Sequence, residues 1–313
     1  MEAVGTKKTL SFGRRKAGGS AIKATVPEKI FLVFNYTFFA VLSFLMLAPM
    51  MHLASLSVSS ESAVLRGDVG LLPDFTNLQF ESFYMVFAND VFIHSFLLTV
   101  RVTLIGSFVG LAVTAAAAYA VSKPYLRGRK AMLLLCIFIM LFHGGMIPTY
   151  VVINGLGLTN TFTVLWITSI FSVFHMLIIK NFYEAIPIEM EESARMDGAG
   201  QFTIFLRIYA PTSKAVYAVI LLFTAVSLWN NFFTAMLYTT RRDLMTLQLL
   251  LMNIVHMASD VFMELHGALV LGEVTTQSVI ASSIVVATVP ILLVYPLLQK
   301  HFTKGVFLGS VKG

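Results

Sequence analysis

The side chains best suited to chemistry gather in one charged stretch, residues 182–211, which lies between two long apolar segments. Its first part, residues 187–197, begins with Pro187, carries acids in its first turns and is followed by Gly198. Proline suits the first helical position, acids favour a helix N-terminus, and glycine supplies a left-handed end, so this part predicts a short helix. At 1.5 Å per residue the helix would be roughly 16 Å long, too short and too polar to span a bilayer. Such a helix is suited to polar contacts with another protein.

Patterns for catalysis by the chain itself are missing from the sequence. There is no G-x-x-x-x-G-K-[ST] loop to hold a nucleoside triphosphate, no G-x-S-x-G elbow and no H-E-x-x-H zinc motif. The seven histidines are dispersed, and Cys136 is the single cysteine, so neither a metal cluster nor a disulfide framework is predicted. We expect no catalytic residue, no metal and no cofactor bound by this chain.

The composition indicates a membrane protein. Of the 313 residues, 57% are apolar and 12% are charged, and the mean hydropathy is +0.82, whereas soluble domains carry about 25% charged residues. The net charge of +6 is scattered between apolar blocks and forms no basic stripe, which argues against nucleic acid as a partner. We predict an all-α protein whose six membrane spans cover residues 30–56, 91–121, 131–152, 162–179, 212–233 and 279–298. The first span is too long for a signal peptide and lacks a clear cleavage site, so we read it as a retained anchor.

Prolines and glycines interrupt two of these spans. Pro49 is expected to kink or end the first span on its far side. Gly144-Gly145 and Pro148 break the third span, and this stretch either reaches a cavity in the protein or forms a plain external loop. We expect two external loops, residues 57–90 with short helices and residues 234–278, the latter with a helix over 245–257 at the outer surface.

The distribution of Lys and Arg fixes the predicted orientation. With the N-terminus inside, the tail 1–29, the turn 122–130, the loop 180–214 and the tail 300–313 hold seven, four, four and three basic residues. That is 18 of the 22, and the positive-inside rule therefore places both termini and the loop 182–211 in the cytoplasm.

The loop 182–211 resembles the "EAA" loop of ABC importer permeases. The family pattern is Glu-Ala-Ala, three residues, Gly, nine residues, Ile, two residues and Pro, and the matching positions here are Glu192-Ser193-Ala194, Gly198, Ile208 and Pro211. The triplet Asp197-Gly198-Ala199 and the pair Ile186-Pro187 are similar to the carbohydrate branch, the maltose-type second permease. Ser193 and Ala210 depart from the pattern, replacing Ala and Leu, but a small serine preserves the packing. The resemblance covers nearly the whole chain.

This resemblance implies type I ABC importer architecture in a bacterial inner membrane. It implies a second permease, two separate ATPase subunits that bind ATP and Mg²⁺, and an extracytoplasmic solute-binding protein, with lipid around the spans. The helix of the loop would sit in a cleft of the ATPase, and the residues implied in coupling are Pro187, Glu191, Glu192, Ser193, Ala194, Arg195, Asp197, Gly198 and Ala199. Lys304 and Lys312 lie in a tail that resembles one entering the ATPase dimer, although basic cytoplasmic tails are also common without such a role.

Arg101 is the unusual residue of the spans. It lies about ten positions into the second span, where a central Arg costs roughly 2.5–3.5 kcal/mol on insertion scales. Two interpretations remain open: it faces the substrate path and meets an anionic or hydroxyl-rich sugar, or it pairs with a partner permease or a backbone carbonyl. The other candidates for a polar path are Tyr119, Asn154, His175 and Asn230, for which packing or interfacial anchoring is the alternative.

The sequence therefore predicts a permease subunit of an ATP-driven importer of oligosaccharide. The run GGMIPTYVVINGLGLTNT (144–161) resembles the subgroup for larger or uronate-containing saccharides. An ion-coupled secondary transporter or channel is the alternative, and it would favour several ionisable residues inside the spans and often inverted repeats. A membrane enzyme is disfavoured because the catalytic patterns are missing.

Overall fold

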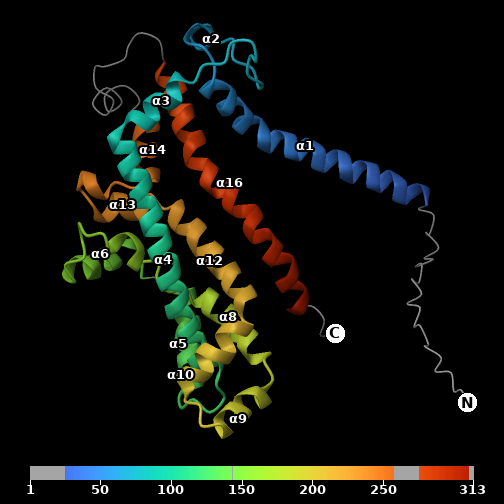
Figure 1. The fold of residues 1–313 in the computed structure, drawn as a ribbon, viewed down its shortest axis with the longest axis vertical. Coiled ribbons are helices and arrows are strands. Elements are labelled where there is room, and N and C mark those ends of the chain that lie inside the picture. Colours follow the sequence, from blue (N-terminus) through green and yellow to red (C-terminus); the bar gives the residue numbers. More distant parts are fainter. Residues whose placement is uncertain (1–24, 143, 257–274, 310–313) are drawn as a thin grey trace, which may run out of the picture. The chain divides into compact units, whose positions relative to one another are not determined.

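The computed structural model describes residues 25–142, 144–256 and 275–309, and these residues contain helices, turns and no strand (Figure 1). The chain divides into two units, Met1–Pro49 and Met50–Gly313. The helices are α1 (Val26–Ser57), α2 (Glu61–Arg66), α3 (Glu81–Ala88), α4 (Asp90–Ser122), α5 (Arg129–Leu141), α6 (Met146–Gly155), α7 (Val164–Ile167), α8 (Val173–Glu184), α9 (Ile188–Met196), α10 (Gln201–Ile204), the π-helix η1 (Phe205–Tyr209), α11 (Ala210–Thr212), α12 (Lys214–Trp229), α13 (Phe233–Tyr238), the 3₁₀ helix η2 (Arg242–Leu244), α14 (Leu247–His256) and α16 (Thr276–Gly309).

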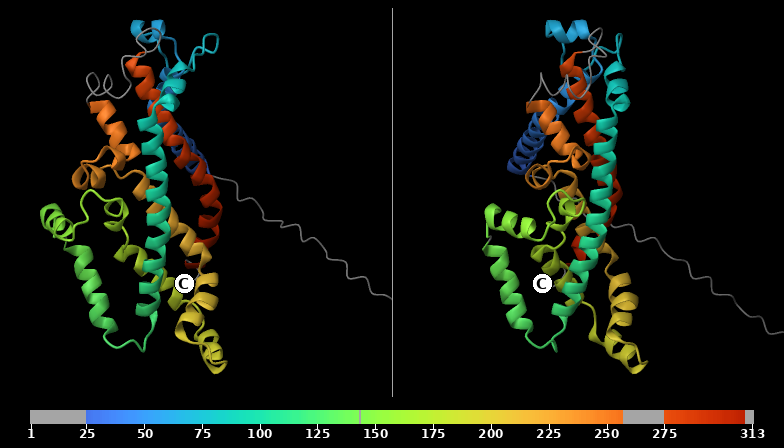
Figure 2. Two further views of the ribbon diagram at one scale, coloured as in Figure 1. Left: turned by 60° about the vertical axis from the view of Figure 1, so that its left-hand side comes forward. Right: turned by 90° about the vertical axis from the view of Figure 1, so that its left-hand side faces the viewer.

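Helix α4 is the central element of the second unit. It is 33 residues long and packs against α12, α8, α14 and α7. In both views of Figure 2, α9 lies near one end of α4, and α3 and α14 lie toward the other end. Small residues on its buried face allow close approach: a Cβ at Gly106 would lie 2.6 Å from Leu228 Cδ1 and 2.8 Å from Trp166 Cβ.

Three buried hydroxyls, one each on α4, α12 and α16, bond to their own helices. Thr99, Thr224 and Ser283 each donate to the carbonyl four residues earlier, at 2.8, 2.9 and 2.8 Å. Such bonds let a hydroxyl lie in an apolar interior without a partner on another helix.

Three helices are long and apolar enough to cross a membrane: α1, α4 and the part of α16 from Thr276 to Val294. Two bent pairs raise this number to five if each pair counts as one span, within the part of the chain that the structure describes. The protein is therefore a multi-pass membrane protein, with fewer continuous spanning helices than the six predicted spans.

The predicted spans differ from the helices where the chain breaks. The third is divided into α5 and α6, which are bent by 115°, as the Gly144-Gly145 pair suggests. The predicted fourth span, 162–179, contains two helices: α7 ends at Ile167, and α8 begins after Ser172, whose side chain accepts a hydrogen bond from His175 N at 3.4 Å. Ser172 is thus an N-cap, a residue that favours a new helix over continuation of the old one.

Other predicted boundaries shift by smaller amounts. Helix α1 does not end at Pro49 but continues to Ser57. The fifth predicted span, 212–233, corresponds to α12, which ends at Trp229 and is preceded by a bend of 82°. Helix α16 continues to Gly309, past the predicted end at 298, so most of the expected tail 300–313 is helical. Short helices α2 and α3 in the 57–90 loop, and α14 within 245–257, agree with the predictions. Residues 1–24 of the expected basic tail lie outside the described residues.

We expect Gly106→Ala to destabilise the protein because its new methyl group would overlap Trp166 Cβ, which the backbone holds in place. Overpacking of this kind costs about 1–3 kcal/mol. Gly155→Ala is the matched control, since no atom lies within 4 Å of a Cβ at that position. Thermal unfolding of the two variants in detergent measures the effect. Equal midpoints for both would contradict the close packing of α4 against α7 and α12.

Candidate functional site

Helix α9 forms as its sequence predicts, with its start one residue later than expected. It spans Ile188–Met196, and Pro187 is the residue before the helix, with φ −56° and ψ 132°. Acids lie in the first turn, where the helix dipole favours them. Gly198 ends the helix with φ +81°, and its N–H donates to Arg195 O at 3.0 Å. The predicted left-handed glycine at this position is confirmed.

One face of α9 points into the protein and the other is exposed. Glu191 is buried, with 4% of its surface exposed, and Ala194 is half-buried. Glu192 and Asp197 are exposed, and Met196 exposes 89% of its surface.

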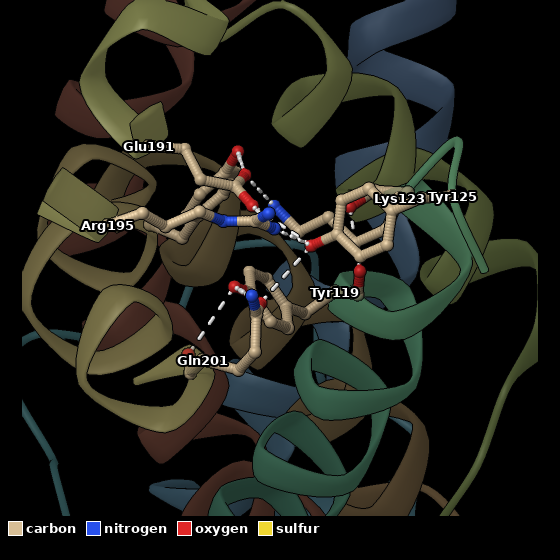
Figure 3. A network of polar contacts seen from close by, with 8 residues as sticks. Tyr119, Lys123, Tyr125, Glu191, Arg195 and Gln201 are labelled. Carbon is tan, nitrogen blue, oxygen red and sulfur yellow. Dashed lines mark hydrogen bonds and ion pairs between the residues drawn. The ribbon is translucent and has the colours of Figure 1, made fainter. Parts of the chain in front are cut away.

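The carboxylate of Glu191 accepts four hydrogen bonds from this chain (Figure 3). Oε2 accepts from Lys123 Nζ at 2.5 Å and from the Tyr209 hydroxyl at 2.8 Å. Oε1 accepts from the Tyr125 hydroxyl at 2.9 Å and from Arg195 Nη2 at 2.6 Å. We refer to Glu191 and these four donors as the Glu191 cluster. Its members come from the end of α4, the following turn, α9 and η1.

Aromatic rings contact both cations of the cluster. Lys123 has 5% of its surface exposed, and its Nζ lies 4.2 Å from the ring centre of Tyr119 and 3.7 Å from that of Tyr209. The guanidinium of Arg195 lies 4.7 Å from the ring centre of Tyr125. Cation–π contacts strengthen when water is excluded, so the rings help compensate for the lost hydration of the lysine.

A glutamine joins the cluster to the next helix. The Oε1 atom of Gln201, the first residue of α10, accepts from the Tyr119 hydroxyl at 2.8 Å and from the Tyr125 hydroxyl at 3.2 Å. Figure 3 shows Gln201 beside Tyr119, on the side of the cluster away from Glu191. Helix α9 and the segment that follows it are therefore both linked to the end of α4 that is predicted to be cytoplasmic.

The electrostatics keep Glu191 ionised. Burial by itself would raise the pKa of Glu191, but hydrogen bonds from Lys123, Tyr209 and Tyr125 outweigh it and lower the pKa to about 2. Burial also lowers the pKa of Lys123, in opposition to its pairing with Glu191. The geometry favours the charged pair, because Glu191 accepts from the ammonium at short range and both its oxygens are fully bonded. Burial and the charge of Glu191 raise the pKa of Tyr209, which therefore stays a hydrogen-bond donor.

A second ion-pair group lies nearby but is more exposed. Glu184, at the end of α8, pairs with Arg129 at the start of α5 and with Lys180 at 2.7 Å. The side chain of Glu184 is 34% exposed, whereas that of Glu191 is 5% exposed. Exposed ion pairs contribute little to stability, so we expect Glu184 and its partners to stabilise the protein less than the Glu191 cluster does.

The residues predicted for coupling lie on α9 and its two ends, but they do not share one environment. We expected Glu191, Glu192, Arg195 and Asp197 to contact a partner, and Glu191 instead faces the interior. Sequence reasoning missed Lys123, Tyr125 and Tyr209 as partners of Glu191. It also missed Gln201, which accepts from Tyr119 and Tyr125. Lys123 counted only as one of the basic residues of the 122–130 turn, and no spacing in the sequence links it to a residue 68 positions away.

The residues predicted for a substrate path are not brought together: no hydrogen bond or ring contact joins any two of them in the described part of the chain. Tyr119 belongs beside the Glu191 cluster, and this location favours anchoring of α9 over contact with substrate. His175 stacks on Phe223, with ring centres 6.0 Å apart. Asn230 donates to Val226 O of its own helix, and Asn154 accepts from Thr159 at 3.4 Å.

Arg101 is exposed on α4 and has no hydrogen bond or ion pair with any residue that the structure describes. Of the two tail lysines, Lys304 lies in α16, and Lys312 lies outside the described residues.

Long apolar helices joined to a short charged helix, buried on one face and exposed on the other, define a multi-pass membrane protein with a polar helix at one end of α4. No family model matches the chain. It is 36% identical to the polygalacturonan/rhamnogalacturonan transport system permease protein YtcP of Bacillus subtilis, over 91% of this chain and 99% of the relative. Protein LplC of the same organism is also 36% identical, over 92% and 97%. A chain of the crystal structure of a bacterial ABC transporter that imports the acidic polysaccharide alginate has a TM-score of 0.84 and 32% identity, over 89% of this chain and 99% of that chain.

The chain belongs to the family of permease subunits of carbohydrate ABC importers. It is a transport subunit and not an enzyme, and this membership rules out the secondary transporter and channel as alternatives.

The low pKa of Glu191 leads to a prediction about acid stability. Because the folded-state pKa of about 2 lies below the ordinary value, the stabilisation is present above about pH 5 and is lost as the pH falls through about 2. Glu191→Gln should therefore lower the free energy of unfolding by about 3 kcal/mol at neutral pH. The difference from the wild type should shrink to less than about half at a pH of about 3.

Thermal unfolding in detergent, followed by intrinsic fluorescence at both pH values, measures this difference. Glu192→Gln is the control, since Glu192 is exposed on the same helix, and it should change stability at neither pH. A loss of stability in Glu191→Gln that is equal at both pH values would contradict the low pKa.

Proposed function

We propose that this chain forms half of the translocation path for an acidic oligosaccharide in a bacterial inner membrane, and that α9 couples it to a separate ATPase. The observation that carries this proposal is the two-sided nature of α9. Its buried side is held by the Glu191 cluster, and its exposed side presents Glu192, Ser193, Met196 and Asp197 to a partner. Because the buried side is ionically fixed, force applied to the exposed side would move the permease rather than unfold the helix.

The charge distribution supports a cytoplasmic location for α9. Basic residues follow α4 and flank α9 at one end of the second unit, whereas Arg66, Arg241 and Arg242 lie in the loops assigned to the other side. Cytoplasmic segments of membrane proteins carry the excess of Lys and Arg. On this orientation, α14 and the 57–90 segment face the solute-binding protein outside the membrane.

The apolar surface of the single chain supports a second permease as a partner. Leu104 and Phe108 of α4 and Leu134 and Phe138 of α5 are exposed. In a bilayer such residues contact lipid or another membrane helix. In the proposed complex, a different permease completes the path, and two ATPase subunits bind the ATP and Mg²⁺ that drive transport.

Two observations support an acidic substrate. The relative named for polygalacturonan/rhamnogalacturonan and the structure named for alginate both concern polymers that contain uronate. Arg101 adds a cation on an apolar helix, exposed on the single chain. An arginine at this depth needs water, a partner group or an anion, and a uronate carboxylate offers the guanidinium two acceptor oxygens.

Copurification with an ATPase tests the coupling proposal, and Gly198→Asp is the decisive variant. The left-handed φ of +81° at Gly198 costs a substituted residue about 1–2 kcal/mol, and the new charge lies beside exposed Asp197. We expect loss of ATPase copurification and of uptake, with normal insertion into the membrane. Gly200→Ala is the control, because Gly200 has φ −74° and no atom within 4 Å of a Cβ. Uptake by Gly198→Asp at the wild-type rate would count against α9 as the coupling element.

Arg101→Ala tests the substrate class. A charged hydrogen bond contributes about 1.5–3 kcal/mol, so the uptake of oligogalacturonate should fall about 10–100-fold while that of a neutral galactooligosaccharide changes little. Arg101→Lys should retain part of the uptake, since the charge remains but the bidentate geometry is lost. Leu104→Ala, an exposed position on the same helix, serves as the control. Unchanged uptake of every sugar by Arg101→Ala would leave the arginine with a structural role.

A further inference from the structure

We propose that Lys123 and Glu191 form a latch through which movement of α9 is passed directly to α4. The two act as positioning residues for transport, and the inference rests on the ATPase coupling proposed above. It adds a second route for that movement, because α8 and α12, which flank α9 in sequence, would otherwise be the only helices pulled by it.

The connectivity of the chain gives α9 no direct covalent link to α4. Helix α9 is linked through short segments to α8 before it and to α10, η1 and α12 after it. Helix α4 ends at Ser122, and Lys123 lies 68 residues before Glu191. Movement of α9 can therefore reach α4 only through side-chain contacts or through intervening helices.

The contacts at the latch are suited to carrying force. Glu191 has all its hydrogen bonds within the protein, and both members of the pair are buried. Separating two buried charges is unfavourable because the low local dielectric strengthens their attraction and water does not replace the lost partner. The Tyr209 ring adds a contact to Lys123 from the segment after α9. The end of α4 is thus held to both α9 and η1.

The other half of α4 contacts the first residue of α14. Thr99 Oγ1 accepts a hydrogen bond from Leu247 N, the first residue of α14, at 2.8 Å in a buried position. Between Thr99 and Lys123 lie roughly 24 residues of continuous helix, about 36 Å at 1.5 Å per residue. Helix α4 is therefore a single rod that joins the latch to the start of α14, and α14 is the element expected to report on its movement.

The test uses the complete transporter, copurified with its ATPases and reconstituted in liposomes. A single cysteine at Val255→Cys, an exposed position on α14, is introduced after Cys136→Ala removes the native thiol. The rate of maleimide labelling is compared without nucleotide and with ATP and vanadate. In the wild-type background we expect a change in rate. In Glu191→Gln and in Lys123→Met the change should be at least about threefold smaller, although the ATPase still copurifies and hydrolyses ATP.

Three controls separate the latch from a merely structural role. Lys123→Arg keeps the cation between the tyrosine rings and should restore the labelling change to within about twofold of wild type. Combining Lys123→Met with Glu191→Gln should be no worse than the more affected single variant. Glu184→Gln, which removes the neighbouring exposed ion pairs, should leave the labelling change intact.

The possible results distinguish failure of the latch from failure of the proposed function. A labelling change that stays at the wild-type level in Glu191→Gln, or that is missing from the wild type itself, overturns the latch while leaving ATPase coupling in place. A wild-type protein that brings no ATPase overturns the proposed function and the latch together. If Glu191→Gln fails to accumulate, Tyr209→Phe removes one hydrogen bond to Glu191 and keeps the ring. That variant should reduce the labelling change by about half, and an unchanged value overturns the latch.

Discussion

The arrangement of this permease around α9 depends on one buried ion pair, Lys123 with Glu191. An ionised carboxylate and an ammonium are costly to remove from water, and the cost is offset only when every acceptor and donor is satisfied. Here Tyr125, Tyr209 and Arg195 complete the coordination of the carboxylate, and two tyrosine rings enclose the lysine. A well-packed apolar pair could hold the same two helices together, but it would tolerate sliding. The charged pair fixes one register of α9 against α4.

The bilayer as solvent explains much of the remaining structure. Apolar side chains are exposed along α1, α4 and α5, where a soluble protein would carry charges. The buried hydroxyls of Thr99, Thr224 and Ser283 each donate to a carbonyl of their own helix. Polar groups with several partners are concentrated instead at the α9 end of α4, where the protein meets water. The apolar body of the protein is therefore suited to lipid, and its polar end is suited to water.

The breaks in the helices have local causes. Ser172 caps α8 and separates it from α7, and the Gly144-Gly145 pair lies between α5 and α6. The bend before α12 lies at Ser213, and the segment that leads to it contains the π-helix η1, an element that is frequent at functional sites. Tyr209 lies in η1 and bonds to Glu191, so the irregular turn brings a donor to the cluster.

Reading the sequence is enough to predict the helical membrane architecture, the short acidic helix, its left-handed glycine end and the relation to importer permeases. These follow from local signals: runs of apolar residues, proline and glycine punctuation, and the fixed spacing from Glu192 to Pro211. Tertiary structure alone decided that Glu191 faces inward while Glu192 faces out. Adjacent residues on a helix point about 100° apart, and which of two glutamates is buried depends on where a cation from another helix lies. The cation is Lys123, which lies 68 residues before Glu191, and no local sequence pattern shows that the two are paired.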